Sequence, residues 1–214
     1  MIVLYHCMSA RSFRPLWALE EMGLPYELKM LPFPPRVFAK SFLDLNPLGT
    51  IPLMLDGPAR MTESSAICHY LATRYGPSPL AVGPEDEAYA AYLNWLFMSD
   101  ATLTFPQTLV LRYTRLEPPE RRVTQVAEDY EKWFFGRLRA VEGALQDREW
   151  LCAGRFTAAD ITVGYALMLA STLDLAGKFP PAVAAYWARL QERPAFRRAI
   201  AAQEKAAAEQ GVKG

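Results

Sequence analysis

Two residue pairs in this sequence have the types and spacing of a binding site. Ile51-Pro52 heads a short apolar run, and Glu63-Ser64 follows eleven residues after the proline. A proline cannot donate to a sheet, so Pro52 belongs at the start or edge of a strand, where it leaves the backbone of Ile51 open to an extended ligand. Glu63-Ser64 opens a helix, whose first N–H groups suit a carboxylate. A strand edge beside such a helix start is a good receptor for a short anionic peptide.

A second group of reactive side chains follows the N-terminal apolar run. The segment 6–14, HCMSARSFR, contains Cys7, Ser9 and Ser12. Ser12 is a good N-cap, and Pro15 falls in the first helical turn, where its missing N–H costs little. These hydroxyls and this thiol are therefore expected where a strand turns into a helix.

The elements that position both groups can be read from residues 1–75. Apolar runs predict strands at 2–5 and 26–31, with a helix between them that starts after Ser12 and ends at Gly23. Such a strand–helix–strand unit implies a parallel pair. The remaining predicted elements are a short irregular helix at 37–45, a hairpin across Asp56-Gly57 and a helix at 64–75. This order, β-α-β-(α)-β-β-α, is that of a thioredoxin-like fold.

Residues 76–79, GPSP, have the composition of a linker, and no convincing strand follows them. Thr157 and Asp160 have capping-box spacing before a segment that is apolar on nearly every side, which is typical of a buried helix. A kink is expected at Pro106. The predicted helices span residues 85–114, 120–145, 161–175, 181–192 and 195–208.

Pro52 with the run Glu63-Ser64-Ser65-Ala66-Ile67 resembles the glutathione site of the cytosolic, bacterial-type glutathione transferases. The resemblance covers essentially the whole chain. It implies the glutathione transferase fold, an α/β thioredoxin-like N-terminal domain followed by an all-α C-terminal domain. We place the glutathione-binding domain at 1–76, the linker at 77–85 and the helical acceptor-substrate domain at 86–214. The resemblance also implies a cytoplasmic homodimer with a role in detoxification.

The resemblance assigns glutathione contacts to particular residues. A cis bond before Pro52 would turn the backbone of Ile51 outward to pair with the cysteinyl unit. Ser64 would bind the γ-glutamyl carboxylate, Glu63 the ammonium group and Lys40 the glycyl carboxylate. The alternatives are that Glu63-Ser64 only caps a helix and that Lys40 is a solvated surface lysine.

Two further assignments fall on the long helix at 85–114. Asp100 matches an acidic residue that reaches the partner subunit's glutathione in some members, although an ordinary exposed aspartate is the alternative. Residues around the Pro106 kink are candidates for the acceptor pocket, with core packing as the alternative for the leucines. The pocket candidates are Leu103, Thr104, Gln107, Thr108 and Leu111.

Glutathione chemistry needs a thiolate, which a hydroxyl donor at a helix start stabilises. No tyrosine lies in the 6–14 loop, so serine-type enzymes are the closer match. Ser9 matches the catalytic serine of zeta-type enzymes. A gapless comparison with beta-type and β-etherase-type relatives instead places Arg11 at a catalytic cysteine and Ser12 beside it. Cys7 is a rival nucleophile that falls early in the loop.

Composition narrows the class of function. Apolar residues make up 51%, and 23 basic residues balance 23 acidic ones, which argues against a basic nucleic-acid interface. No run of about 18 apolar residues suggests a membrane span. Three cysteines without C-x-x-C spacing fit a reducing compartment, and two histidines without clustered ligands argue against a metal site.

The sequence therefore indicates an enzyme that uses glutathione as co-substrate and directs its thiolate at a small hydrophobic electrophile. Two alternatives are a glutathione-dependent isomerase of the maleylacetoacetate type, suggested by the run Ser9–Arg14, and an ether lyase or dehalogenase. A non-catalytic interaction module is a third, of another class. No short motif encodes the electrophile.

Overall fold

The computed structural model describes residues 1–212, which form two compact units. The first contains Met1–Ala81 together with the chain from Gln191 onward, and the second contains Val82–Leu190. The sequence-based division instead placed everything after residue 85 in the helical domain. The C-terminal helix packs in the first unit. This unit also contains both groups of candidate site residues, the pairs Ile51-Pro52 and Glu63-Ser64 and the segment 6–14.

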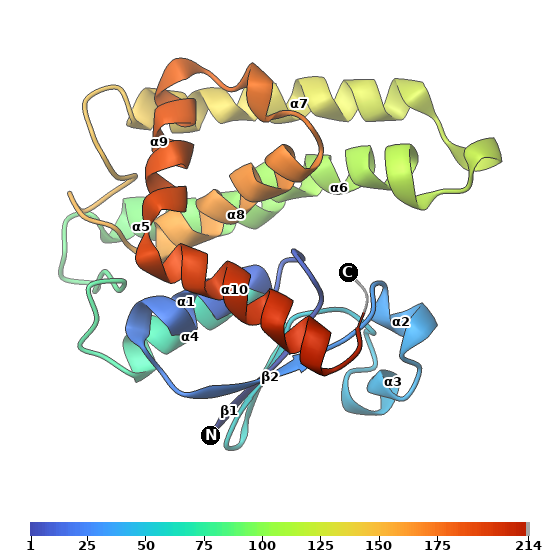
Figure 1. Ribbon diagram of the computed structural model, residues 1–214. Coiled ribbons are helices and arrows are strands. Elements are labelled where there is room, and N and C mark those ends of the chain that lie inside the picture. Colours follow the sequence, from blue (N-terminus) through green and yellow to red (C-terminus); the bar gives the residue numbers. More distant parts are fainter. Residues whose placement is uncertain (213–214) are drawn as a thin grey trace. The chain divides into compact units, whose positions relative to one another are not determined.

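The first unit is built on a mixed four-stranded sheet, as predicted (Figure 1). Its strands are β1 (Ile2–His6), β2 (Tyr26–Met30), β3 (Leu53–Asp56) and β4 (Ala59–Met61), in the order β2-β1-β3-β4. β1 runs parallel to β2 and antiparallel to β3, and β4 completes a hairpin with β3. The buried side chains of Leu4, Leu53 and Met54 anchor the central strands.

Helices of the same unit pack around this sheet. They are α1 (Phe13–Met22), α2 (Pro35–Phe38), α3 (Phe42–Leu45), α4 (Ser64–Arg74) and α10 (Pro194–Glu209). α1 packs against both α4 and α10. It ends as predicted at Gly23, whose φ of 61° is the left-handed conformation that glycine adopts readily. The irregular helix predicted at 37–45 is two short helices.

Aromatic packing and ion pairs hold α10 in the first unit. The Phe196 ring makes edge contacts with Trp17 and Phe13 of α1, at centroid distances of 4.9 and 5.4 Å. The Arg193 guanidinium donates two hydrogen bonds to the Glu21 carboxylate, at 2.6 and 2.8 Å. Buried aromatic pairs and bidentate arginine pairs are both geometrically specific, so α10 has a fixed register on α1.

Helices joined by loops make up the second unit, residues Val82–Leu190, and no strand occurs in it. It comprises α5 (Tyr89–Met98), η1 (Ser99–Thr104), α6 (Phe105–Leu111), η2 (Arg112–Leu116), η3 (Pro119–Arg121), α7 (Thr124–Ala144), α8 (Ala158–Thr172), η4 (Ala176–Lys178) and α9 (Pro181–Glu192). A π-helical segment, η1, ends two residues before Pro106, while the kink expected at Pro106 stays a prediction. Since proline has no N–H to donate, regular α-helical bonding is interrupted there.

α8 is the core of the second unit, and its capping box is confirmed. Every side chain from Ala158 to Ala170 is buried, as an apolar helix requires. The Thr157 hydroxyl accepts from the N–H of Ala159, and the Asp160 carboxylate accepts from the N–H of Thr157 at 2.8 Å.

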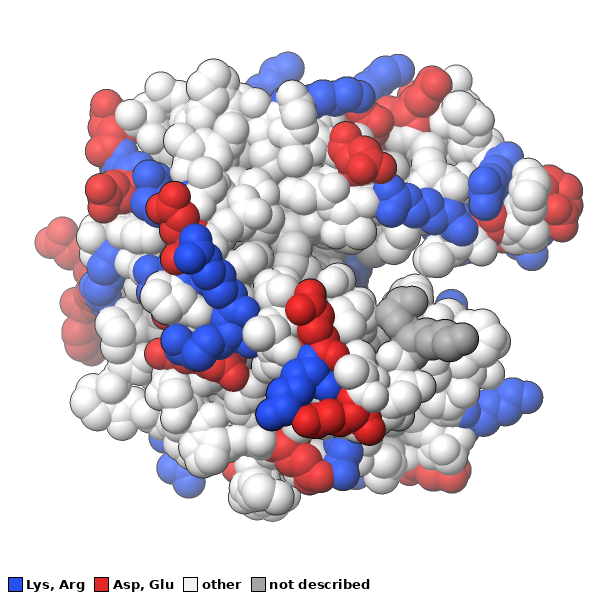
Figure 2. All heavy atoms as spheres, viewed as in Figure 1, with Lys and Arg blue, Asp and Glu red and all other residues white. Residues whose placement is uncertain are grey.

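Acidic and basic side chains are interspersed over the face of the molecule in Figure 2, without a field of one sign. None of the helices in residues 1–212 is both long and apolar enough to cross a membrane.

Candidate functional site

Ser12 lies at the junction of β1 and α1, but its hydroxyl faces inward. The side chain is fully buried, and its Oγ lies 2.7 Å from Nδ1 of His6 and 3.4 Å from the N–H of Cys7. The residue has helical dihedral angles, and its side chain makes no capping hydrogen bond. The helix therefore starts where the sequence predicted, whereas the predicted hydroxyl cap is wrong, because the hydroxyl is used to hold His6.

The directions of the hydrogen bonds around His6 follow from one backbone donor. The N–H of Ser9 lies 3.0 Å from the side-chain oxygen of Gln203, and an N–H can only donate. The same oxygen lies 2.9 Å from Nε2 of His6, so Nε2 carries a proton. Burial lowers the pKa of His6 to about 4, so the ring is neutral at pH 7 and Nδ1 is bare. Nδ1 consequently accepts the only hydroxyl proton of Ser12.

The hydroxyl of Ser9 differs from that of Ser12, because it accepts a hydrogen bond instead of donating one. Its side chain is half-buried, and its Oγ accepts a long hydrogen bond, 3.5 Å, from the amide nitrogen of Gln203. With an acceptor role toward Gln203, the hydroxyl keeps its own proton for another partner. The φ of Ser9 is 52°, a left-handed conformation that costs a non-glycine residue about 1–2 kcal/mol. Such conformations cluster at functional sites, where neighbouring contacts hold them.

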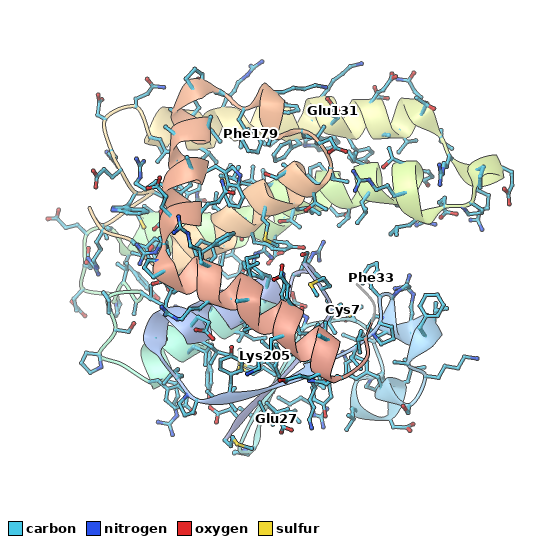
Figure 3. The ribbon with its side chains drawn as sticks, viewed as in Figure 1. Cys7, Glu27, Phe33, Glu131, Phe179 and Lys205 are labelled. Atoms are coloured by element: carbon cyan, nitrogen blue, oxygen red, sulfur yellow. The ribbon has the colours of Figure 1, made fainter. Side chains whose placement is uncertain are left out.

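Cys7 has the character of an inert thiol. It is buried, its Sγ–H points at the carbonyl oxygen of Pro32 at 3.7 Å, and burial raises its pKa to about 12. Figure 3 labels Cys7 in the loop that follows β1. The thiol stays protonated at neutral pH and is a poor nucleophile.

The bond between Ile51 and Pro52 is cis, as predicted. Pairing of β3 with β1 begins at Leu53, opposite Tyr5, so Ile51 lies beyond the ladder. Within residues 1–212, no hydrogen bond to the backbone of Ile51 is present. An extended ligand can therefore pair with it.

Ser64 is the first residue of α4 and has a charged partner behind it. Its side chain is 2% exposed, and its Oγ accepts a 2.8 Å hydrogen bond from Nη1 of Arg14. Arg14 comes from the first turn of α1 and is itself fully buried. The hydroxyl of Ser64 therefore keeps its proton for an anion. The first N–H groups of α4 and the guanidinium add positive potential at the same place.

Sequence reasoning missed two of these contacts. It assigned no contact between Arg14 and Ser64, and it gave Gln203 no role. A signal existed in each case. Arg14 stands among the apolar residues that open α1, and Gln203 falls in register with the buried Phe196, Ala199 and Ala206 of α10.

The other predicted glutathione contacts lie at more exposed positions. Glu63 is exposed immediately before α4, without a side-chain capping bond, and Lys40 is exposed between α2 and α3. Asp100 is half-buried on η1 in the second unit. Their roles toward glutathione stay predictions.

The residues proposed for the acceptor pocket divide into two groups. Leu103, Thr104 and Gln107 are fully buried, and Thr104 and Gln107 donate to backbone carbonyls of Ser99, Leu103 and Ala166. Thr108 and Leu111 are half-buried and retain accessible surface. Contact with an acceptor is therefore easiest for these two. Among residues 1–212, no three histidine, cysteine or carboxylate side chains gather as a metal site.

Comparison with known proteins gives consistent matches. Residues 8–74 match the family model "Glutathione S-transferase, N-terminal domain". The chain is 30% identical to glutathione S-transferase 3 of Schizosaccharomyces pombe, over 95% of this chain and 88% of that protein. A glutathione transferase structure from Methylococcus capsulatus superposes with a TM-score of 0.83 at 27% identity, covering 95% and 99% of the two chains. The Ure2p5 transferase of Phanerochaete chrysosporium, cocrystallized with 1-(S-glutathionyl)-2,4-dinitrobenzene, gives 0.84 at 25% identity, covering 97% and 96%.

Proposed function

Because the chain belongs to the glutathione S-transferase family, we propose that it transfers the thiolate of glutathione to a small hydrophobic electrophile, with Ser9 as the thiol-stabilising hydroxyl. The observation that carries the proposal is a pair of serines whose hydroxyl oxygens accept hydrogen bonds from other side chains. Ser9 accepts from Gln203 and Ser64 accepts from Arg14, so each keeps a proton for the ligand. One donor for the γ-glutamyl carboxylate, one donor for the cysteine thiol, and the open backbone of Ile51 for the cysteinyl unit together match the needs of glutathione.

Glutathione lies in an extended conformation in this proposal. Its cysteinyl unit pairs with the backbone of Ile51, and its γ-glutamyl carboxylate sits on the hydroxyl of Ser64 and the first N–H groups of α4. The buried charge of Arg14 strengthens this anion site, because an ionised donor makes the hydroxyl behind it a better donor in turn. Glu63 takes the ammonium group and Lys40 the glycyl carboxylate.

Activation of the thiol follows from the position of Ser9. A free cysteine thiol has a pKa near 8.5, and lowering it by ~2 units needs ~2.7 kcal/mol of preferential thiolate stabilisation. A hydroxyl proton aimed at the sulfur before the start of α1 supplies part of that energy. Ser12 cannot do so while its proton is held by His6, so its role is to keep the loop in shape.

Thr108 and Leu111 are the proposed acceptor contacts, because both retain accessible surface. Bringing the electrophile to the thiolate is the second source of rate acceleration. The proposed setting is the cytoplasm. Retention on immobilised glutathione and conjugation of a 1-halo-2,4-dinitrobenzene test the function together. Binding without conjugation would favour the isomerase or lyase chemistry, and absence of binding would refute the glutathione assignment.

Replacing Ser64 by alanine is expected to weaken glutathione binding by about 1–3 kcal/mol, the range for losing a hydrogen bond to a charged group. Isothermal titration calorimetry of the two proteins measures the difference. Thr73→Ala is a matched control, because its exposed hydroxyl also lies on α4 but bonds only within that helix. Equal affinities for the Ser64 variant and the unmodified protein would show that Ser64 serves the fold alone.

The protein is proposed to act as a homodimer, with Asp100 reaching the glutathione of the partner. Phe97 and Phe105 support this proposal, since they are 72% and 49% exposed on the α5–α6 segment. Light scattering at micromolar concentration should give twice the mass of the 24.1 kDa chain. A monomer mass would contradict it.

A further inference from the structure

Gln203 sits at the centre of a buried hydrogen-bond network although it is far from the site in sequence. Its side chain is 2% exposed and contacts His6 and Ser9, which are 197 and 194 residues away. Lys205, two residues further along α10 and labelled in Figure 3, has a side chain that is 76% exposed. Gln203 therefore lies on the inner face of the helix, with the loop between β1 and α1 against it.

We infer that Gln203 is a positioning residue for thiol activation, which orients the hydroxyl of Ser9 toward the sulfur of bound glutathione. The inference rests on the proposed function and extends it to the C-terminal helix. Gln203 does not itself touch the substrate in this scheme. It acts through Ser9 and through His6, which in turn holds Ser12.

Only an amide satisfies all the contacts of this position. The oxygen of Gln203 accepts from the N–H of Ser9 at 3.0 Å and from Nε2 of His6 at 2.9 Å. Its nitrogen donates to the Oγ of Ser9. A carboxylate could accept the first two bonds, but it would also accept the hydroxyl proton of Ser9 and turn it away from the ligand. An apolar side chain would leave the donors of Ser9 and His6 unpaired.

The backbone of Ser9 depends on the same contact. Ser9 has a left-handed φ of 52° and its N–H donates to the Gln203 oxygen, so this bond helps to hold a conformation that the residue otherwise disfavours. The contacts of Phe196 and Arg193 with α1 fix α10 and so fix the amide. The geometry of the loop between β1 and α1 therefore depends on α10, which is far away in the sequence.

Two variants and one matched control separate positioning from stability. Gln203→Met removes every hydrogen bond at similar volume, and Gln203→Glu keeps two bonds and reverses the third. Gln210→Met is the control, because Gln210 is the C-cap residue of the same helix and its amide also bonds the body of the unit, at the backbone of Leu28 and Met30. The thiolate absorbance of bound glutathione against pH is measured for each protein. The nitrogen chemical shifts of His6, which report its tautomer, are measured without ligand.

Both Gln203 variants are expected to raise the thiol pKa by about one unit and to lower kcat/KM about 10-fold. The His6 shifts should change in Gln203→Met. The control should lose stability while its thiol pKa and His6 shifts stay those of the unmodified protein. Unchanged thiol pKa in either folded Gln203 variant, or an effect of equal size in the control, would overturn the inference and leave the proposed function standing. Failure of the unmodified protein to lower the thiol pKa would overturn both.

Discussion

Replacement of Ser9 by alanine is expected to lower kcat/KM for conjugation by about 30-fold and to raise the pKa of bound glutathione by about 1.5 units, because losing a hydrogen bond to the thiolate costs ~2 kcal/mol of the ~2.7 kcal/mol of thiolate stabilisation. Ser9 is half-buried, so the methyl group of alanine fits without opening a cavity. The pKa is read from thiolate absorbance against pH, and kcat/KM from initial rates with a 1-halo-2,4-dinitrobenzene.

Two neighbouring variants are the controls for this result. Cys7→Ala should leave the thiol pKa unchanged, since Cys7 is buried and its own pKa is raised to about 12. Ser12→Ala should cost about 1–3 kcal/mol of stability, because it leaves a buried imidazole nitrogen without a donor, with a smaller change in the thiol pKa than Ser9→Ala. If Ser12→Ala gave the larger pKa change, Ser12 would be the activating residue. If Cys7→Ala alone altered the titration, the serine mechanism would be wrong.

Replacement of Asp160 by alanine is expected to give the largest loss of stability, at least about 3 kcal/mol. The carboxylate accepts from the N–H groups of Leu151 and Thr157 and from the hydroxyls of Thr157 and Tyr186, all inside the second unit. Each buried donor left without an acceptor costs about 1–3 kcal/mol. Denaturant unfolding followed by circular dichroism measures the change, and a loss below 1 kcal/mol would refute this account of the cap.

Asp160→Asn refines the test through pH. Burial raises the pKa of Asp160 from 3.8 to about 6, so between these values the folded state binds more protons than the unfolded chain. The contribution of this group to the free energy of unfolding therefore falls as the pH rises from about 4 to 6. His6, with a pKa lowered to about 4 by burial, contributes in the opposite sense over pH 4 to 6.5. In Asp160→Asn, only the contribution of Asp160 to the pH dependence of the free energy of unfolding should vanish. The difference in this pH dependence between the unmodified protein and the variant therefore measures that contribution.

The sequence by itself determined the local features of this protein. Periodicity and turn residues predicted all four strands, the end of α1 at Gly23 and the capping box of α8. The cis bond before Pro52 and the position of Ser64 at the start of α4 also agree with the predictions. The strands, the end of α1 and the capping box depend on interactions within a few residues, so the sequence alone predicts them. The cis bond and the position of Ser64 follow from a sequence pattern that the family shares.

Only the tertiary structure decided what the serines of the first loop can do. The sequence left open whether Ser9 or Ser12 stabilises the thiolate, because both residues precede the same helix and carry a hydroxyl group. The choice depends on which hydroxyl keeps its proton, and that is set by His6 and by an amide almost 200 residues later in the chain. Long-range contacts of this kind arise when α10 returns to pack on α1, and no local pattern encodes the partner that a buried polar side chain will meet.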